Sequence, residues 1–281
     1  MFQEPIPSLL LPHDQALPLA GLGLYRILDD DTMETAVHAA LSAGIRMFDT
    51  ASFYKNEDIL GDVLSDCSVP RSELFITTKI WNTAQRLGDV RGSVERSLER
   101  LGLDYIDLYL IHWPVPGCFS RTWREMIRLQ EEGLIRSIGV SNFEIYHLEQ
   151  LEQASDVPPA VNQIECHPLW RREKLVSYCQ QKGIAVQAYA PLAQGLYQSR
   201  PILQKIGAQH CKTAAQIGLR WLIQRDISVI PKSANPDRIY ENSALFDFKL
   251  TEAEMQAIDQ MDEHYRSITV PEDISVSEWE M

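Results

Sequence analysis

The sequence predicts an α/β protein with a (β/α)8 TIM-barrel fold. Short β-rich runs alternate with amphipathic helices, and eight such strands can be counted, each followed by a helix. This alternation indicates a parallel sheet with right-handed crossovers. The length of 281 residues fits one barrel domain, which typically has about 250 residues. We therefore expect a single domain over residues 1–281.

Eight runs have the composition and length of buried strands. They are Ala20–Leu24, Ile45–Phe48, Leu74–Lys79, Tyr105–Ile111, Leu134–Val140, Val161–Glu165, Ile184–Tyr189 and Ile227–Ile230. Eight repeated units favour a closed barrel over an open, doubly wound sheet. Gly21 and Gly23 form only a fragment of a G-x-G-x-x-G pattern after the first strand. A Rossmann dinucleotide site is therefore not supported.

Caps and apolar spacing mark the helices. Asp31 and Asp89 are each expected to cap a helix, Thr213 opens a capping box, and Asn235 with Pro236 supplies an N-cap and a first-turn proline. The expected helices run from Asp31 to Gly44, Asn56 to Leu64, Asp89 to Gly102, Ser120 to Glu132, Glu144 to Gln153, Arg172 to Lys182, Thr213 to Gln224, and onward from Asn235. Outside this repeat we expect an N-terminal β-hairpin over Leu9–Leu19, an extra helix from Thr251 and a C-terminal tail over Val270–Met281.

The composition excludes several classes of function. The formal net charge is −13, and a field of this sign repels nucleic acids and anionic membranes. No run approaches the roughly 20 apolar residues of a membrane span, and the N-terminus lacks the basic start of a signal peptide. The cysteine count is odd and no pair has CxxC spacing, which favours free thiols in a reducing cytoplasm; they are Cys67, Cys118, Cys166, Cys179 and Cys211.

Three strands bring polar groups to one end of the predicted barrel. Asp49 follows one strand, Lys79 ends the next, and His112 follows the third, with Tyr54 in the loop after Asp49. Active sites of such barrels lie at the C-terminal ends of the strands. The side chains are a carboxylate, an ammonium, an imidazole and a phenol. We expect them to form one catalytic site, without a metal ion.

These four groups suit the reduction of a carbonyl. A phenol has a pKa near 10, and an ammonium beside it is expected to lower that pKa. Tyr54 would then be the general acid and Lys79 the group that tunes it, with Asp49 anchoring Lys79. His112 would orient the carbonyl by a hydrogen bond. The hydride must come from a cofactor, because no side chain donates one.

The motifs around these residues resemble the aldo-keto reductases over nearly the whole chain. They are Asp49-Thr-Ala-Ser-Phe-Tyr54, Thr77-Thr-Lys79-Ile-Trp81, Leu110-Ile-His112-Trp-Pro114, Ile138-Gly-Val-Ser141-Asn142, Val161-Asn-Gln163-Ile-Glu, Ala188-Tyr189-Ala-Pro-Leu192, Ile230-Pro-Lys232-Ser233 and Arg238-Ile-Tyr-Glu241-Asn242. Each motif alone is modest, but eight in the right order are highly specific. The short acidic tail is similar to that of small bacterial members that reduce methylglyoxal or diketogluconate.

The resemblance implies an NADPH site. Ser141, Asn142 and Gln163 would hold the carboxamide, and the nicotinamide would stack on Tyr189. Leu192, in the same motif as Tyr189, is also expected to bind the cofactor. The positions that would contact the adenosine end, including a clamp for its 2′-phosphate, are Lys232, Ser233, Arg238, Glu241 and Asn242. Residue Asn235 opens a helix whose N-terminus favours an anion. Two cations at this end favour NADPH over NADH and do not exclude NADH.

The sequence leaves the substrate and some details open. Tyr25 replaces a Trp that relatives often carry, and we expect it to line the substrate pocket with Trp81 and Trp113; core packing is the alternative for each. Trp279 either covers the site or pins the tail to the barrel. We expect a cytoplasmic monomer that reduces a small aldehyde or ketone. The alternatives are a Schiff-base aldolase that uses Lys79 and a non-catalytic barrel that senses its cofactor.

Overall fold

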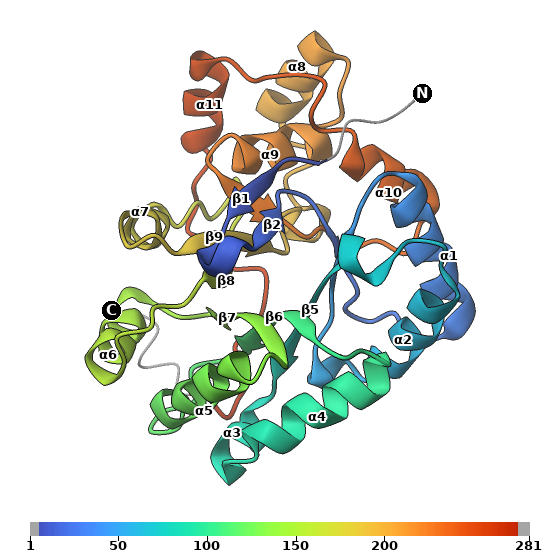
Figure 1. Cartoon of the computed structure of the whole chain (residues 1–281). Coiled ribbons are helices and arrows are strands. Elements are labelled where there is room, and N and C mark those ends of the chain that lie inside the picture. Colours follow the sequence, from blue (N-terminus) through green and yellow to red (C-terminus); the bar gives the residue numbers. More distant parts are fainter. Residues whose placement is uncertain (1–5, 275–281) are drawn as a thin grey trace.

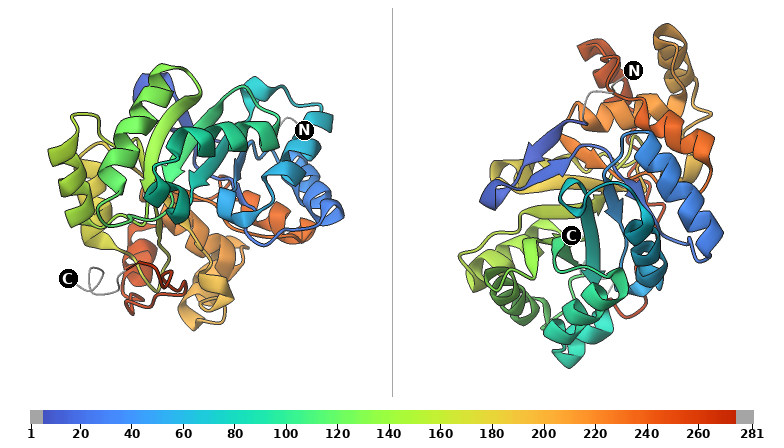
Figure 2. Two further views of the ribbon diagram at one scale, coloured as in Figure 1. Left: turned by 90° about the horizontal axis from the view of Figure 1, so that it is seen from below. Right: turned by 45° about the vertical axis from the view of Figure 1, so that its right-hand side comes forward.

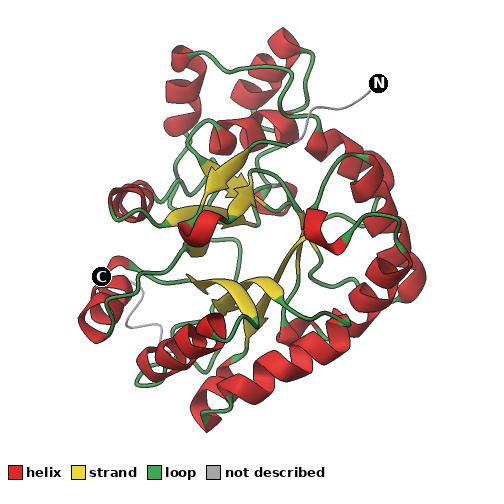
Figure 3. Cartoon of the chain, viewed as in Figure 1, coloured by secondary structure: helices red, strands yellow, loops and turns green. Residues whose placement is uncertain are grey.

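The computed structural model describes residues 6–274, and Trp279 lies outside them. Eight parallel strands form one sheet in the order β10-β9-β8-β7-β6-β5-β4-β3. Parallel bridges join Ala20 to Val229 and Gly23 to Lys232, so the two edges of the sheet meet. Helices surround the strands on the outside (Figures 1 and 3). The predicted (β/α)8 barrel is therefore confirmed.

All eight predicted barrel strands are present. The strands are β3 (Leu22–Gly23), β4 (Met47–Asp49), β5 (Phe75–Ile80), β6 (Ile106–Ile111), β7 (Ile135–Ser141), β8 (Val161–Glu165), β9 (Ala185–Tyr189) and β10 (Ile227–Val229). The α-helices are α1 (Asp30–Ser42), α2 (Glu57–Asp66), α3 (Asn82–Leu87), α4 (Val90–Leu101), α5 (Phe119–Glu131), α6 (Ile145–Ala154), α7 (Glu173–Gln181), α8 (Pro201–His210), α9 (Ala214–Ile223), α10 (Pro236–Ser243) and α11 (Glu252–Asp259).

Three expectations about the helices are corrected by the structure. Helix α1 is capped by Asp29, whose carboxylate accepts a hydrogen bond from the Thr32 N–H, and Asp31 instead lies in the first turn. Asp89 does stand at the N-cap of α4, but its carboxylate pairs with Arg96 at 2.6 Å. The sequence analysis did not predict α3 and α8, which lie in the loops after β5 and β9. Loop helices of this kind do not alter the strand–helix repeat.

The two ends of the barrel are covered differently. The predicted hairpin forms from β1 (Ser8–Leu10) and β2 (Ala16–Pro18). Its Leu11 and Leu17 pack with Met47, Phe75 and Val161, which are the first residues of β4, β5 and β8. The hairpin therefore closes the N-terminal ends of the strands. The C-terminal segment, residues 264–274, lies at the opposite end (Figure 2, left).

Candidate active site

The structure places the four expected catalytic side chains together. Asp49 ends β4, Lys79 lies near the end of β5 and His112 follows β6. Tyr54 ends a 3-10 turn, η2 (Ser52–Tyr54), that follows β4. All four come from the C-terminal side of the barrel, because parallel strands leave the sheet at the same end.

Asp49 and Lys79 form a buried ion pair. Lys79 Nζ lies 2.6 Å from Asp49 Oδ1 and also donates to the backbone oxygen of Thr50 at 2.8 Å. Both side chains are almost fully buried. Burial raises the pKa of Asp49 and lowers the pKa of Lys79, whereas the contact between them acts in the opposite direction. The pair fixes the ammonium at the base of the site.

Tyr54 lies above this pair. Lys79 Nζ is 5.0 Å from the centroid of the Tyr54 ring. The expected lowering of the pKa of Tyr54 is not found: burial, and next the charge of Asp49, raise the pKa of Tyr54 well above its ordinary value. Removal of water destabilises the phenolate, and the nearby Asp49 carboxylate destabilises it further. Tyr54 is therefore a protonated phenol at neutral pH.

His112 faces the phenol edge-on, with ring centroids 5.6 Å apart. Burial, and next the charge of Lys79, lower the pKa of His112 well below its ordinary value. The imidazole is therefore neutral at pH 7 and has one N–H to donate. Its Nδ1 has no hydrogen-bond partner within residues 6–274. The arrangement supplies a neutral hydrogen-bond donor next to a protonated phenol.

Aromatic rings surround these two groups. The Tyr25 ring lies 4.9 Å from the Tyr54 ring, and the Trp81 ring contacts His112 edge-on at 5.0 Å. Phe53, which the sequence analysis missed, stacks on Trp81 at 3.8 Å and is 44% exposed. Phe53 directly precedes Tyr54 in the sequence, and this adjacency is the signal that could have identified it as a site residue. Trp113 is instead buried with Val115 and Ile274 of the C-terminal segment.

The residues expected at the nicotinamide are also adjacent to one another. Ser141 Oγ donates to the backbone oxygen of Gln163 at 2.9 Å. Asn142 Nδ2 donates to the backbone oxygen of His112, and Asn142 Oδ1 accepts from the Tyr189 hydroxyl at 2.7 Å. Asn142 has a φ of 63°, which asparagine tolerates better than most residues. These contacts join Asn142 and Tyr189 to the His112 backbone, and the Gln163 amide donates to Asp49 at 2.7 Å.

The residues expected at the adenosine end follow β10. Asn235 Oδ1 accepts from the Arg238 N–H at the start of α10, as predicted. Ser233 and Asn242 are buried, and Glu241 accepts from the Thr213 hydroxyl. Leu192, the other residue expected to bind the cofactor, lies instead after β9 and is half-buried.

Arg26 is a further cation at this end that the sequence analysis missed. Burial, and next the charge of Arg26, lower the pKa of Lys232. Within residues 6–274, no carboxylate pairs with Arg26, Lys232 or Arg238, although acidic residues outnumber basic ones by 39 to 26. Like charges left unpaired in an acidic protein fit the phosphates of a nucleotide. Arg26 was missed because its proximity to β10 depends on the closure of the barrel.

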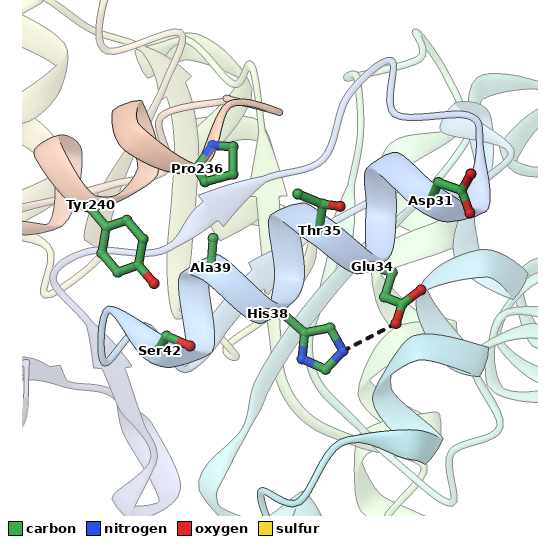
Figure 4. Close-up of a pocket in the computed structure, with 8 residues that line it drawn as sticks. All are labelled: Asp31, Glu34, Thr35, His38, Ala39, Ser42, Pro236 and Tyr240. Atoms are coloured by element: carbon green, nitrogen blue, oxygen red, sulfur yellow. Dashed lines mark ion pairs between the residues drawn. The ribbon is translucent and has the colours of Figure 1, made fainter.

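A separate surface depression lies between α1 and α10 (Figure 4). It contains an exposed pair, Glu34 and His38, 3.7 Å apart, and Tyr240 at its other side. None of the expected site residues lines it. Among the described residues there is no cluster of His, Cys, Asp and Glu that could hold a metal ion, and no described helix is long and apolar enough to cross a membrane.

The sequence model of the Aldo/keto reductase family matches residues 20–263. The chain belongs to the aldo-keto reductase family. It is 45% identical to a methylglyoxal reductase of Yersinia pestis, over 91% of this chain and 93% of that protein. It is 41% identical to a glyoxal reductase of Bacillus subtilis (strain 168), over 92% of this chain and 94% of the relative.

Solved aldo-keto reductase structures share the fold. An enzyme from a Medee basin deep-sea metagenome library superposes with a TM-score of 0.91 at 41% identity, covering 95% of this chain and 100% of the other. An aldo-keto reductase complexed with NADPH superposes with a TM-score of 0.88 at 34% identity, covering 94% and 90%. The protein is therefore an oxidoreductase of a family that uses a nicotinamide cofactor.

Proposed function

We propose that this aldo-keto reductase reduces a small aldehyde or ketone, such as methylglyoxal or diketogluconate, to the alcohol with NADPH. The observation that carries the proposal is the position of the protonated Tyr54 phenol beside neutral His112 and above the Asp49–Lys79 pair. Two similar proteins are named as reductases of glyoxal and methylglyoxal, and both of these substrates are small dicarbonyls.

The residues present fit NADPH at both ends of the expected site. Arg26, Lys232 and Arg238 supply positive charge without a carboxylate partner in the described part of the chain, and the N-terminus of α10 adds a favourable end for an anion. Ser141, Asn142 and Gln163 place a hydroxyl and two amide side chains near Tyr189, and the Oε1 of Gln163 accepts no hydrogen bond within residues 6–274. When bound, NADPH supplies the hydride that no side chain can provide.

The chain's own residues handle the proton. His112 donates a hydrogen bond to the substrate oxygen and fixes its position next to Tyr54. Tyr54 then gives its proton to that oxygen as negative charge develops on it. Lys79 stabilises the phenolate that remains, because its ammonium lies 5.0 Å from the ring. Asp49 keeps the ammonium charged and in place.

The Schiff-base alternative has less support in this geometry. An aldolase lysine must be a free amine to attack a carbonyl, whereas Lys79 is held by both Asp49 and the Thr50 carbonyl. Borohydride trapping of a substrate on Lys79 would restore that alternative.

The test is the consumption of NADPH or NADH with a panel of methylglyoxal, aromatic aldehydes and keto-sugar acids. Turnover with NADPH that is lost in Tyr54→Phe supports the proposal. Cofactor binding with no turnover on any carbonyl supports the sensing alternative, and no cofactor binding overturns the assignment. Size-exclusion chromatography of the same sample tests the expected monomer.

A further inference from the structure

A chain of polar side chains runs through the interior of the barrel away from Asp49. Gln163 Nε2 donates to Asp49 Oδ2 and to Gln187 Oε1, each at 2.7 Å. Gln187 Nε2 donates to Ser228 Oγ at 3.3 Å and contacts Met47 Sδ at 3.4 Å. Ser228 Oγ donates to the backbone oxygen of Pro18 at 2.7 Å. This row of hydrogen bonds thus links the ion pair of Asp49 and Lys79 to the N-terminal hairpin.

The strand register creates this row. Gln163 on β8 is level with Gln187 on β9, which is level with Ser228 on β10. All three side chains are almost fully buried. A buried polar group without a partner is costly, so three such residues in one layer must satisfy one another. Apolar side chains are the usual filling of such a barrel, so a layer of three polar side chains is a departure from that pattern.

The two acceptors at the ends of this hydrogen-bonded row fix the orientation of every side chain in it. The Pro18 carbonyl and the Asp49 carboxylate can only accept hydrogen bonds. Asp49 therefore requires the NH2 group of Gln163, and Gln187 must turn its oxygen toward the second hydrogen of that NH2 group. The Gln187 NH2 group then faces Ser228, whose hydroxyl donates to Pro18. A reversed Gln163 would place its oxygen against a carboxylate.

These hydrogen bonds determine which atom of the Gln163 amide remains able to bind a ligand. Both hydrogens of its amide are committed inside the barrel, while its Oε1 has no hydrogen-bond partner within residues 6–274. This oxygen is also absent from the fully enclosed polar atoms that lack a partner, so it is accessible. Gln163 can present only an acceptor to a ligand at the rim.

We propose that Gln187 is a positioning residue for Gln163: by accepting the second amide hydrogen, it forces Gln163 to present an oxygen to the NH2 group of the nicotinamide carboxamide. The inference rests on the proposed NADPH site. Gln187 itself is not accessible to a ligand, since its side chain is fully buried. Without Gln187, Asp49 still binds one amide hydrogen of Gln163, but the second hydrogen is free to donate to the carboxamide oxygen, and the site then accepts either end of the amide.

The test compares binding of NADP+ and of its 3-acetylpyridine analogue, whose methyl ketone keeps the carbonyl but lacks the NH2 group. Dissociation constants come from quenching of protein fluorescence. The wild type is expected to prefer NADP+ by roughly tenfold, and Gln187→Leu to reduce that preference by about three- to tenfold, the range of one hydrogen bond. Differences in ring electronics between the two ligands cancel when variants are compared.

Gln187→Glu is the matched control. A buried Glu at this position is driven to its neutral form, in which the carbonyl accepts from Gln163 and the O–H donates to Ser228. Its preference for NADP+ should equal that of the wild type. Ser228→Ala, which leaves Gln187 without its anchor, should lose preference by a smaller factor and serves if Gln187→Leu does not fold.

The outcomes separate the two proposals. A wild type that binds neither dinucleotide overturns the proposed function. A wild type that binds both equally, or a Gln187→Leu variant with an unchanged preference, overturns the positioning role while leaving the reductase assignment intact. A loss of preference in Gln187→Glu as large as in Gln187→Leu would also overturn it, since only a general structural effect treats the two alike.

Discussion

Glu165 Oε1 accepts hydrogen bonds from both the backbone N–H and the hydroxyl of Ser267, each at 2.6 Å. Glu165 ends β8, and its Oε2 also accepts from the Ile268 N–H at 3.2 Å. Further along the segment, Asp273 Oδ2 lies 2.6 Å from Nη1 of Arg86, a residue of α3. These contacts tie the C-terminal segment to the barrel beyond β8 and beyond β5, on the side of the candidate active site.

Ser267→Ala should loosen the C-terminal segment. It removes one partly buried hydrogen bond, which is worth about 1 kcal/mol, and leaves the backbone bond to Glu165 in place. Urea unfolding should show a free energy of unfolding lower by that amount, and hydrogen exchange of residues 264–274 should quicken. Ser42→Ala, at an exposed position ending α1, is the control and should change neither. Unchanged exchange in Ser267→Ala would show that other contacts hold the segment.

Tyr54→Phe should lower kcat for carbonyl reduction by roughly 100- to 10,000-fold, the usual contribution of a general acid. NADPH affinity should stay nearly constant, because the ring remains and only the hydroxyl is lost. Steady-state kinetics and a fluorescence titration give the two quantities. Tyr105→Phe, just before β6 at the opposite end of the barrel, is the matched control. Normal turnover in Tyr54→Phe would remove this phenol from the mechanism.

Arg238→Ala should weaken the binding of NADPH by roughly tenfold to a hundredfold, as expected for one charge-assisted contact. It should weaken the binding of NADH far less. The difference arises because only NADPH carries the 2′-phosphate. Affinities for both cofactors should be measured at one salt concentration, since screening weakens exposed charges. Arg124→Ala on the outer helix α5 should alter neither. Equal losses for both cofactors would refute the phosphate clamp.

Asn56→Asp tests the hydrogen bonds that hold the loop carrying Tyr25. The Asn56 NH2 group donates to the backbone oxygens of Leu24 and Ile27, each at 2.9 Å, and its oxygen accepts from the Thr50 hydroxyl. An aspartate has nearly the same shape but turns a carboxylate toward two carbonyl oxygens. We expect a loss of about 3 kcal/mol in the free energy of unfolding and a higher KM as Tyr25 shifts. A stability equal to wild type would show that packing alone holds this loop.

Acid sensitivity should come in part from a buried histidine. Burial lowers the pKa of His147 to about 3, whereas a histidine in the unfolded chain has a pKa near 6.5. Between these values the unfolded state binds one more proton than the native state. The free energy of unfolding therefore falls as the pH drops below about 6.5, by up to about 1.4 kcal/mol per pH unit for this residue.

His147→Gln removes that proton while keeping an acceptor for the Glu144 N–H, which His147 Nδ1 binds at 3.0 Å. Urea unfolding at several pH values should show a shallower decline for the variant between pH 6 and 4. Above pH 7 the difference between the two proteins should be constant, since both states of His147 are then neutral. Parallel curves throughout would contradict the shifted pKa.

The repeat of strands and helices is readable from the sequence, as are the positions of Asp49, Tyr54, Lys79 and His112 near the strand ends. Both follow from local information: the period of apolar residues sets each element, and parallel strands must all end on the same side of the sheet. The motifs then indicated the family. Caps were less certain, as Asp29 in place of Asp31 shows, because neighbouring acidic residues can compete for the same N–H groups.

How these groups influence one another depends on the folded barrel. The direction of the pKa shift of Tyr54 depends on how much water the barrel excludes, which no local pattern encodes. The approach of Arg26 to Lys232 requires the first and last strands to meet. The contact of Gln163 with Asp49 joins residues 114 positions apart, and the hold of Glu165 on Ser267 spans 102. Such contacts depend on the register of closed strands, because only the complete barrel places side chains from distant segments in one layer.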